Sequence, residues 1–513
     1  MTTESAAAPK VKDRFRIDAV AMFLYLSVCH AWALTLHPLG KDFSILAGAD
    51  SELPTSMRRL VALQVGWFGD NPLGYHVLSF ALLYACMLAV YAWVKQMHPD
   101  GPFWLGTLAA TMFMANPVHA DGVLHLTSAA TLAPALAALV TLYLYGTAID
   151  GGRTKIVLAI IAFALTSWSF PETRGLTLLI PMYEFFVLRP RWQDSVPRAA
   201  VFVLLGFVIW AVQGGHLPAL AVPLAQSISP LYFIFYPIGF LPETAHQFHA
   251  HAWLGWIAVA SVAGVVLLIV RAARRPIILF GLLGMLAYRI AGNANHVDPV
   301  HLVGGGELLV ETALFCAGLT ALFKRMMEHP KWKRLIITST SLLCVLYFAL
   351  MIETVSAWRH AGAAVEAFQA EAQAVSSRGN ATLLLVPDYL YYRGAPMALS
   401  EAISFDTQFS DPVRHISLLQ LHYDPSLAVA LSVIEVGRDE FGVEINMPDP
   451  GRFAVWPYTL LHAGDSRVSG DVHAKVDTAD DTRMEWSIRY TPVPGVVLMT
   501  PFADSPLEAG VIP

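Results

Sequence analysis

Hydrophobic runs long enough to cross a lipid bilayer recur through the N-terminal two thirds of the chain and then stop. The clearest are Ile17–Leu36, Tyr75–Val94, Leu124–Tyr145, Trp253–Val270 and Leu335–Met351. A helix needs about 20 apolar residues to cross ~30 Å of hydrocarbon, and runs of this length are too long for the strands of a membrane barrel. The sequence therefore predicts an α-helical polytopic membrane bundle over residues 1–352, followed by a water-soluble domain over residues 353–513.

The distribution of charge agrees with this division. Hydrophobic residues make up 56% of the chain and charged residues only 14%, whereas soluble domains carry about 25% charged residues. From Glu353 onward there are 21 acidic and 10 basic residues, so the negative net charge resides in the tail. An acidic tail is typical of a solvated surface, and no basic surface for nucleic acid is expected. Membrane lipids are the expected surroundings of the N-terminal part.

Lysine and arginine predict the orientation, because they concentrate in cytoplasmic loops. Basic residues cluster at 10–16, 153–155, 189–198, 271–275 and 324–334. Threading the chain between them gives about eleven spans, a cytoplasmic N-terminus and a periplasmic C-terminal domain. The apolar piece Leu231–Leu241 is short and bounded by proline, so we expect it to be re-entrant or to lie on the surface. A tail without cysteine and an alanine-rich composition suit a bacterial inner membrane.

The predicted periplasmic part begins with a helical pattern over residues 357–375, in which apolar residues share one face. Short strand-like runs follow and are separated by turns rich in Pro, Gly and Asp. An α+β domain that is rich in strands is therefore expected. All four cysteines fall inside predicted spans, where a thiol behaves as a small apolar group, and no disulfide framework is predicted.

Ionisable residues outside the basic loops gather in the loops of the opposite face. A carboxylate there can act as general base toward a hydroxyl acceptor, with Asp42 and Asp50 as candidates, although this loop could also hold no catalytic acid. Arginine and histidine can neutralise a lipid-linked phosphate as it departs. The candidate substrate-binding residues on this face are Arg58, Arg59, His119, Asp121, Glu172 and Arg174.

No metal site is predicted, although a divalent cation is compatible with such chemistry. His246 and His249 could share one face of a helix, but His251 would point elsewhere and no cysteine joins them. This spacing favours a solvated or interfacial loop over a metal site. The cofactor requirement stays open.

Four motifs resemble those of GT-C-type membrane glycosyltransferases, most closely the TMTC-like and protein O-mannosyltransferase-like group. Asn71–His76 (NPLGYH) resembles the NPxGYH entry of that group, and Asn116–Asp121 (NPVHAD) resembles its HPVHxE motif. Pro171–Arg174 (PETR), followed by Pro181, is similar to the KExxxxxP segment. Tyr236–Gly239 (YPIG) is similar to the WPLGL piece. The matches occur in the family's order and cover roughly residues 15–325.

The resemblance implies about eleven spans and an inverting transfer of sugar from a polyprenyl-phosphate-linked donor to a protein or glycan acceptor on the outer face. It also implies that an acid in the first outside loop is the general base. The chain departs from the family where Lys41-Asp42 replaces a paired acidic motif and Ser128–Thr131 replaces a charged element. A non-catalytic GT-C-like accessory subunit, with a protein partner on its C-terminal domain, is the alternative. A transporter or flippase is less favoured, because no repeated halves are visible.

Overall fold

The computed structural model describes most of the N-terminal part and the regular segments of the C-terminal part. The described residues are 11–46, 55–69, 71–99, 101–150, 152–188, 192–213, 276–291, 305–328, 330–376, 382–385, 388–392, 395–404, 415–417, 420–422, 430–437, 440–446, 466–469, 472–479, 483–490 and 496–499. Four predicted features lie outside them: Asp50, the piece Leu231–Leu241 with its family-like YPIG, the histidines of 246–251 and the span Trp253–Val270.

The chain divides into two compact units. Unit 1 comprises Met1–Thr35 and Leu53–Val355, and unit 2 comprises Leu36–Glu52 and Ser356–Pro513. The division groups the segment after the first apolar helix with the C-terminal residues. We describe each unit by itself.

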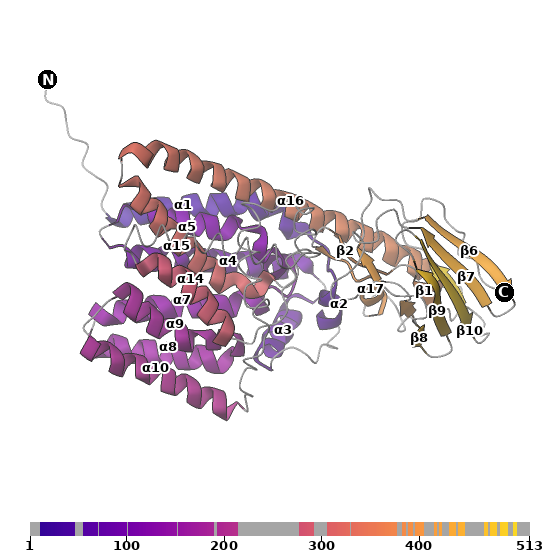
Figure 1. Cartoon of the computed structure of the whole chain (residues 1–513), viewed down its shortest axis with the longest axis horizontal. Coiled ribbons are helices and arrows are strands. Elements are labelled where there is room, and N and C mark those ends of the chain that lie inside the picture. Colours follow the sequence, from indigo (N-terminus) through magenta and orange to yellow (C-terminus); the bar gives the residue numbers. More distant parts are fainter. Residues whose placement is uncertain are drawn as a thin grey trace, which may run out of the picture. The chain divides into compact units, whose positions relative to one another are not determined.

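Unit 1 is helical, and its longer helices run side by side (Figure 1). The helices are α1 (Val11–His30), α3 (Thr55–Phe68), α4 (Pro72–Met97), α5 (Trp104–Ala115), α6 (Ala120–Leu124), α7 (Ala129–Asp150), α8 (Arg153–Ser169), α9 (Leu176–Tyr183), α10 (Trp192–Val212), α14 (Pro276–Ala291), α15 (Leu309–Met327) and the first part of α16 (Pro330–Ser376). Short 3-10 turns are η1 (Ala31–Thr35), η2 (Pro117–His119), η3 (Pro171–Gly175) and η5 (Gly305–Leu308), and η4 (Glu184–Leu188) is a π-helical turn.

Five described segments are long and apolar enough to cross a membrane. They are Phe15–Thr35, Pro72–Met97, Ala129–Ile149, Gln193–Val212 and Lys333–Ala374. Large apolar side chains on these helices are exposed, among them Leu24 on α1, Leu204 on α10 and Leu342 on α16. Such exposure is unfavourable in water and expected in lipid, so the chain is a membrane-embedded helical protein.

Asparagine–proline pairs explain two element starts that carry family-like motifs. The Asn71 side chain accepts a hydrogen bond from the backbone N–H of Leu73 at 3.1 Å, and Pro72 occupies the first helical position of α4. Asn116 caps η2 in the same way, through the N–H of Val118 at 3.1 Å. Asparagine is a favoured N-cap. Proline is tolerated at the next position, because the N–H that it lacks would have no partner at the start of a helix.

Unit 2 contains α2 (Lys41–Leu46), the last part of α16, α17 (Leu399–Ser404) and paired strands. The strands are β1 (Thr382–Leu385), β2 (Asp388–Tyr392), β3 (Ala395–Pro396), β4 (His415–Ser417), β5 (Gln420–His422), β6 (Ala430–Gly437), β7 (Glu440–Asn446), β8 (Ser466–Ser469), β9 (Val472–Ala479), β10 (Arg483–Tyr490) and β11 (Val496–Met499). They pair in the orders β11-β1-β4, β3-β2-β5 and β6-β7-β10-β9-β8. The last sheet is antiparallel, and β1 is parallel to both of its neighbours.

The helix expected over residues 357–375 is present as the continuation of the last apolar helix. α16 runs without a break from Pro330 to Ser376. Residues 352–356 contain neither glycine nor proline, so nothing in the sequence ends a helix between the apolar run and the amphipathic run.

Candidate functional site

The helices of unit 1 place several predicted residues at one end of the bundle. Helices joined by short connections run antiparallel, and α4 packs against α5 as α7 packs against α8. The starts of α4 and α7 therefore lie at the same end as the last residues of α5 and α8. We call this the His125 end, after a residue that follows α6. The opposite end, where η4 follows α9, is the Glu184 end.

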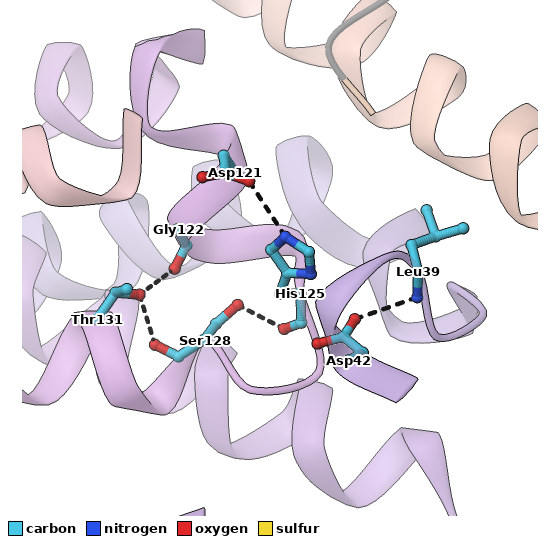
Figure 2. A network of polar contacts seen from close by, with 7 residues as sticks. All are labelled: Leu39, Asp42, Asp121, Gly122, His125, Ser128 and Thr131. Carbon is cyan, nitrogen blue, oxygen red and sulfur yellow. Dashed lines mark hydrogen bonds and ion pairs between the residues drawn. The ribbon is translucent and has the colours of Figure 1, made fainter. Parts of the chain in front are cut away.

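A buried acid–imidazole pair occupies the His125 end. Asp121 Oδ1 lies 3.1 Å from His125 Nε2, four residues further along the chain (Figure 2). The two side chains are 10% and 3% exposed, respectively. A carboxylate in this position fixes the orientation of the imidazole. The pair thus places an oriented acid and imidazole within a mostly apolar bundle.

Hydroxyl groups tie the chain around this pair. Ser128 Oγ donates to the carbonyl of His125, and the Thr131 hydroxyl lies within bonding distance of the carbonyls of Gly122 and Ser128 (Figure 2). The Gly122 carbonyl belongs to the one-turn helix α6, and the carbonyls of His125 and Ser128 also accept backbone N–H groups of the turn before α7. The short segment between η2 and α7 is therefore held in one shape.

A close glycine crossing packs η5 onto this segment. η5 contacts both η2 and α6. A Cβ added at Gly122 would collide with the backbone of Gly306, and one added at Gly306 would collide with Gly122. Two glycines are needed because the backbones themselves touch. α15 follows η5 directly, and its first turn holds Glu311, which is buried at 1% exposure.

Arg174 lies in η3, between α8 and α9, and belongs to the same end because α8 finishes there. Its Nη2 donates to Gln213 Oε1 at 2.8 Å, and Gln213 Nε2 donates to the carbonyl of Trp168 at 2.9 Å. Burial lowers the pKa of Arg174, and the neighbouring Glu172 carboxylate opposes that shift, so the guanidinium remains charged at neutral pH. Its buried Nε has no hydrogen-bond partner among the described residues.

The other predicted residues have different surroundings. His119 is the last residue of η2, directly before α6. Arg58 and Arg59 are exposed on α3, a helix that contacts α4 and α7. Asp42, in unit 2, is buried in the first turn of α2, and its Oδ2 accepts the N–H of Leu39 at 3.2 Å (Figure 2). The structure thus brings His119, Asp121, Glu172 and Arg174 to one end of unit 1, whereas Asp42 belongs to unit 2.

Three residues of the His125 end were not among the predicted site residues. His125 has a local signal, because its spacing of four from Asp121 matches a helical turn. Gln213 has none, since it is 39 residues from Arg174 in the sequence. Glu311 lies inside an apolar run, where an intramembrane acid is itself a functional signal.

The Glu184 end holds a second buried acid with stronger partners. Glu184 is fully buried, and its Oε1 accepts from Arg198 Nε at 2.9 Å and lies 2.7 Å from Nη2. The Tyr145 hydroxyl donates to its other oxygen. Both carboxylate oxygens are occupied, so this cluster is a structural ion pair.

Searches against known proteins add nothing to this geometry: no protein-family model matches the chain, and no curated protein matches its sequence. Among the described residues, no group of three or more His, Cys, Asp or Glu side chains is arranged to hold a metal ion.

Proposed function

We propose that this membrane protein is a glycosyltransferase that moves a sugar, with inversion, from a polyprenyl-phosphate-linked donor to a protein or glycan acceptor on the outer face. Two observations support this proposal. Four family-like motifs occur in order along the chain. Two of them contribute ionisable groups to one end of a helical membrane bundle: Asp121 is buried, and Arg174 is half-buried. The second observation carries most weight, because buried ionisable groups in a membrane bundle tend to mark function.

The proposed topology has about eleven spans, a cytoplasmic N-terminus and a periplasmic, β-rich C-terminal domain in a bacterial inner membrane. Its support is the alternation of basic loops. Arg153, which opens α8 at the Glu184 end, belongs to a basic cluster assigned to the cytoplasm. The connections at the His125 end are poorer in lysine and arginine, so the His125 end is assigned to the outer face.

Each candidate residue has a role that its chemistry supports. Asp42 would accept the proton of the acceptor hydroxyl as that oxygen attacks the anomeric carbon. The bond from this carbon to the phosphate oxygen breaks on the opposite side, and polyprenyl phosphate leaves. Arg174, with one hydrogen bond already fixing its guanidinium, is suited to neutralise the departing phosphate. His119, Asp121 and Glu172 would line the donor site, and the exposed Arg58 and Arg59 would attract the lipid phosphate from the membrane surface.

A non-catalytic GT-C-like subunit is the second candidate. Specific departures from the family pattern favour it, since Lys41 stands where the group has an acid and Ser128–Thr131 carry no charge. In the structure Ser128 and Thr131 bond to backbone carbonyls, which is a structural use. Such a subunit would bind a partner protein through its C-terminal domain and would not depend on Asp42.

A transfer assay separates these candidates. The purified protein would be reconstituted in liposomes with polyprenyl-phosphate sugars, and glycosylated product would be measured for the wild type and for Asp42→Asn. Loss of a general base lowers the rate ~10²–10⁴-fold. The matched control is Glu371→Gln, which removes an exposed acid of the same unit. Wild-type activity in Asp42→Asn excludes the assigned base, and absence of transfer in the wild type favours the accessory subunit.

A further inference from the structure

The segment that carries Asp42 does not have the surroundings of a solvated loop. The sequence places it among the polar connections between apolar spans. In the structure, four of its apolar side chains are buried: Leu36, Leu39, Phe43 and Ile45. Asp42 itself is 1% exposed. Residues of a free surface loop are normally accessible, so this burial requires a cover.

C-terminal residues of the same unit contact this segment. α2 contacts α17, and the Cβ that an alanine would add at Gly362 of α16 would lie 3.2 Å from the Cβ of His37. This part of α16 buries one face at helical spacing. That face consists of Trp358, Ala361, Val365, Phe368 and Ala372. Three side chains of α17 are buried as well, namely Leu399, Ala402 and Ile403.

One buried amide joins the three pieces. Gln369 Oε1 lies 3.3 Å from His37 Nε2, and Gln369 Nε2 donates to the carbonyl of Ala402 at 3.0 Å. The Gln369 side chain thus bridges the Asp42 segment, α16 and α17. Because Gln369 is only 4% exposed and its bond to Ala402 is buried, removing it would leave the Ala402 carbonyl without this donor and without water to replace it.

A glycine fixes the entry into α2. Gly40 has a φ of +52°, a backbone conformation that residues other than glycine rarely adopt. A Cβ at this position would also lie 2.9 Å from the Cβ of Pro396, in β3. Both constraints act one residue before α2, so a larger residue at 40 would displace the helix that carries Asp42.

We infer that the C-terminal residues of unit 2 act as a clamp that positions Asp42, with Gln369 and Gly40 as positioning residues. The clamp consists of the last part of α16, β3 and α17. This inference rests on the proposed function, since it assigns the C-terminal residues to the presentation of the general base. It does not require them to bind the acceptor.

Hydrogen exchange of the full-length protein tests the clamp without any substrate. In Gln369→Ala, amides of residues 36–46 should exchange about tenfold faster than in the wild type, since one buried and one part-buried hydrogen bond are lost. Gln373→Ala, an exposed glutamine on the same helix, is the matched control and should exchange like the wild type. Gly40→Ala should accelerate exchange in the same residues by a separate route. Unchanged exchange at residues 36–46 in both Gln369→Ala and Gly40→Ala overturns the clamp.

The transfer assay then tests what the clamp does. In Gln369→Ala, kcat should fall about tenfold while KM for the polyprenyl-linked donor stays within twofold, because a displaced base affects the reaction more than donor binding. Faster exchange with unchanged kcat overturns the positioning role. If the wild type transfers no sugar, the proposed function and with it the role of positioning a base fail, and the exchange data still decide whether the C-terminal residues hold α2.

Discussion

Two buried acids in unit 1, Asp121 and Glu184, show how differently one chain can use a carboxylate. Glu184 follows α9 in a π-helical turn and is closed off by the permanent cation of Arg198 and by Tyr145. Asp121 lies in a single helical turn and pairs with His125, whose charge depends on protonation. A carboxylate fixed by a permanent cation has little freedom to do anything but hold helices together. One whose partner is an imidazole is not fixed by a permanent charge and can respond to a ligand.

The secondary structure around the two acids also differs: long helices surround Glu184, and short elements surround Asp121. Glu184 connects α7 and α10, two of the long apolar helices. Asp121 sits among short elements, η2, α6 and η5, that are held by hydroxyl–carbonyl bonds and by the contact of Gly122 with Gly306. Functional groups commonly lie on irregular segments supported by a rigid scaffold. The His125 end fits that pattern, and the Glu184 end fits the scaffold.

The largest expected effect is on stability at the Glu184 end. Arg198→Ala should lower the free energy of unfolding by about 3–5 kcal/mol, because it leaves a fully buried carboxylate without its cation. Unfolding monitored in detergent measures this loss. The control is Arg325→Ala, which removes an exposed i,i+3 pair with Glu328 and should change stability by less than about 1 kcal/mol. Equal effects of the two changes would contradict the assignment of Glu184 and Arg198 as a structural ion pair.

The next effect concerns the glycine crossing at the His125 end. Gly122→Ala should destabilise the protein by about 1–3 kcal/mol, since the methyl group meets backbone that has no rotamer to change. Gly66→Ala is the matched control, because a Cβ on this α3 glycine meets no other atom within 4 Å. That change should stabilise by about 0.5–1 kcal/mol. If Gly122→Ala were as stable as the wild type, η5 would not be held against α6 as described.

A smaller stability effect with a larger functional one is expected at Asp121. Asp121→Asn keeps an oxygen that can accept from His125, so it should lower the free energy of unfolding by about 1 kcal/mol or less. Glu184→Gln should cost more, because it leaves Arg198 without a counter-charge. Sugar transfer should fall further in Asp121→Asn than in Glu184→Gln once folded protein is matched. If transfer fell further in Glu184→Gln, the functional role would belong to the Glu184 end and the account would be wrong.

The sequence predicts the features that depend on neighbouring residues. Apolar runs mark the five long helices, and the pairs Asn71-Pro72 and Asn116-Pro117 mark element starts, because a cap and its helix are adjacent in the chain. The spacing of Asp121 and His125 also follows from one helical turn. These features need no knowledge of the tertiary fold.

Features that join distant residues could not be predicted in this way. Gln213 meets Arg174 across 39 residues, and Gln369 meets His37 across 332 residues. Because hydropathy and local spacing carry no information on such pairs, the segment after the first apolar helix reads as a polar loop although it is buried. The total number of membrane spans and the orientation of the chain in the membrane remain predictions from hydropathy and charge.

Binding of polyprenyl phosphate tests the central claim most directly, which is that the His125 end receives a lipid-linked phosphate. Native mass spectrometry of the protein in lipid nanodiscs would follow binding to the wild type, Arg174→Met and the exposed-site control Arg325→Met. We expect saturable binding to the wild type and the control, and binding about tenfold weaker or more in Arg174→Met, which loses a charge-assisted contact. Equal binding by all three proteins, or none by the wild type, would contradict the account.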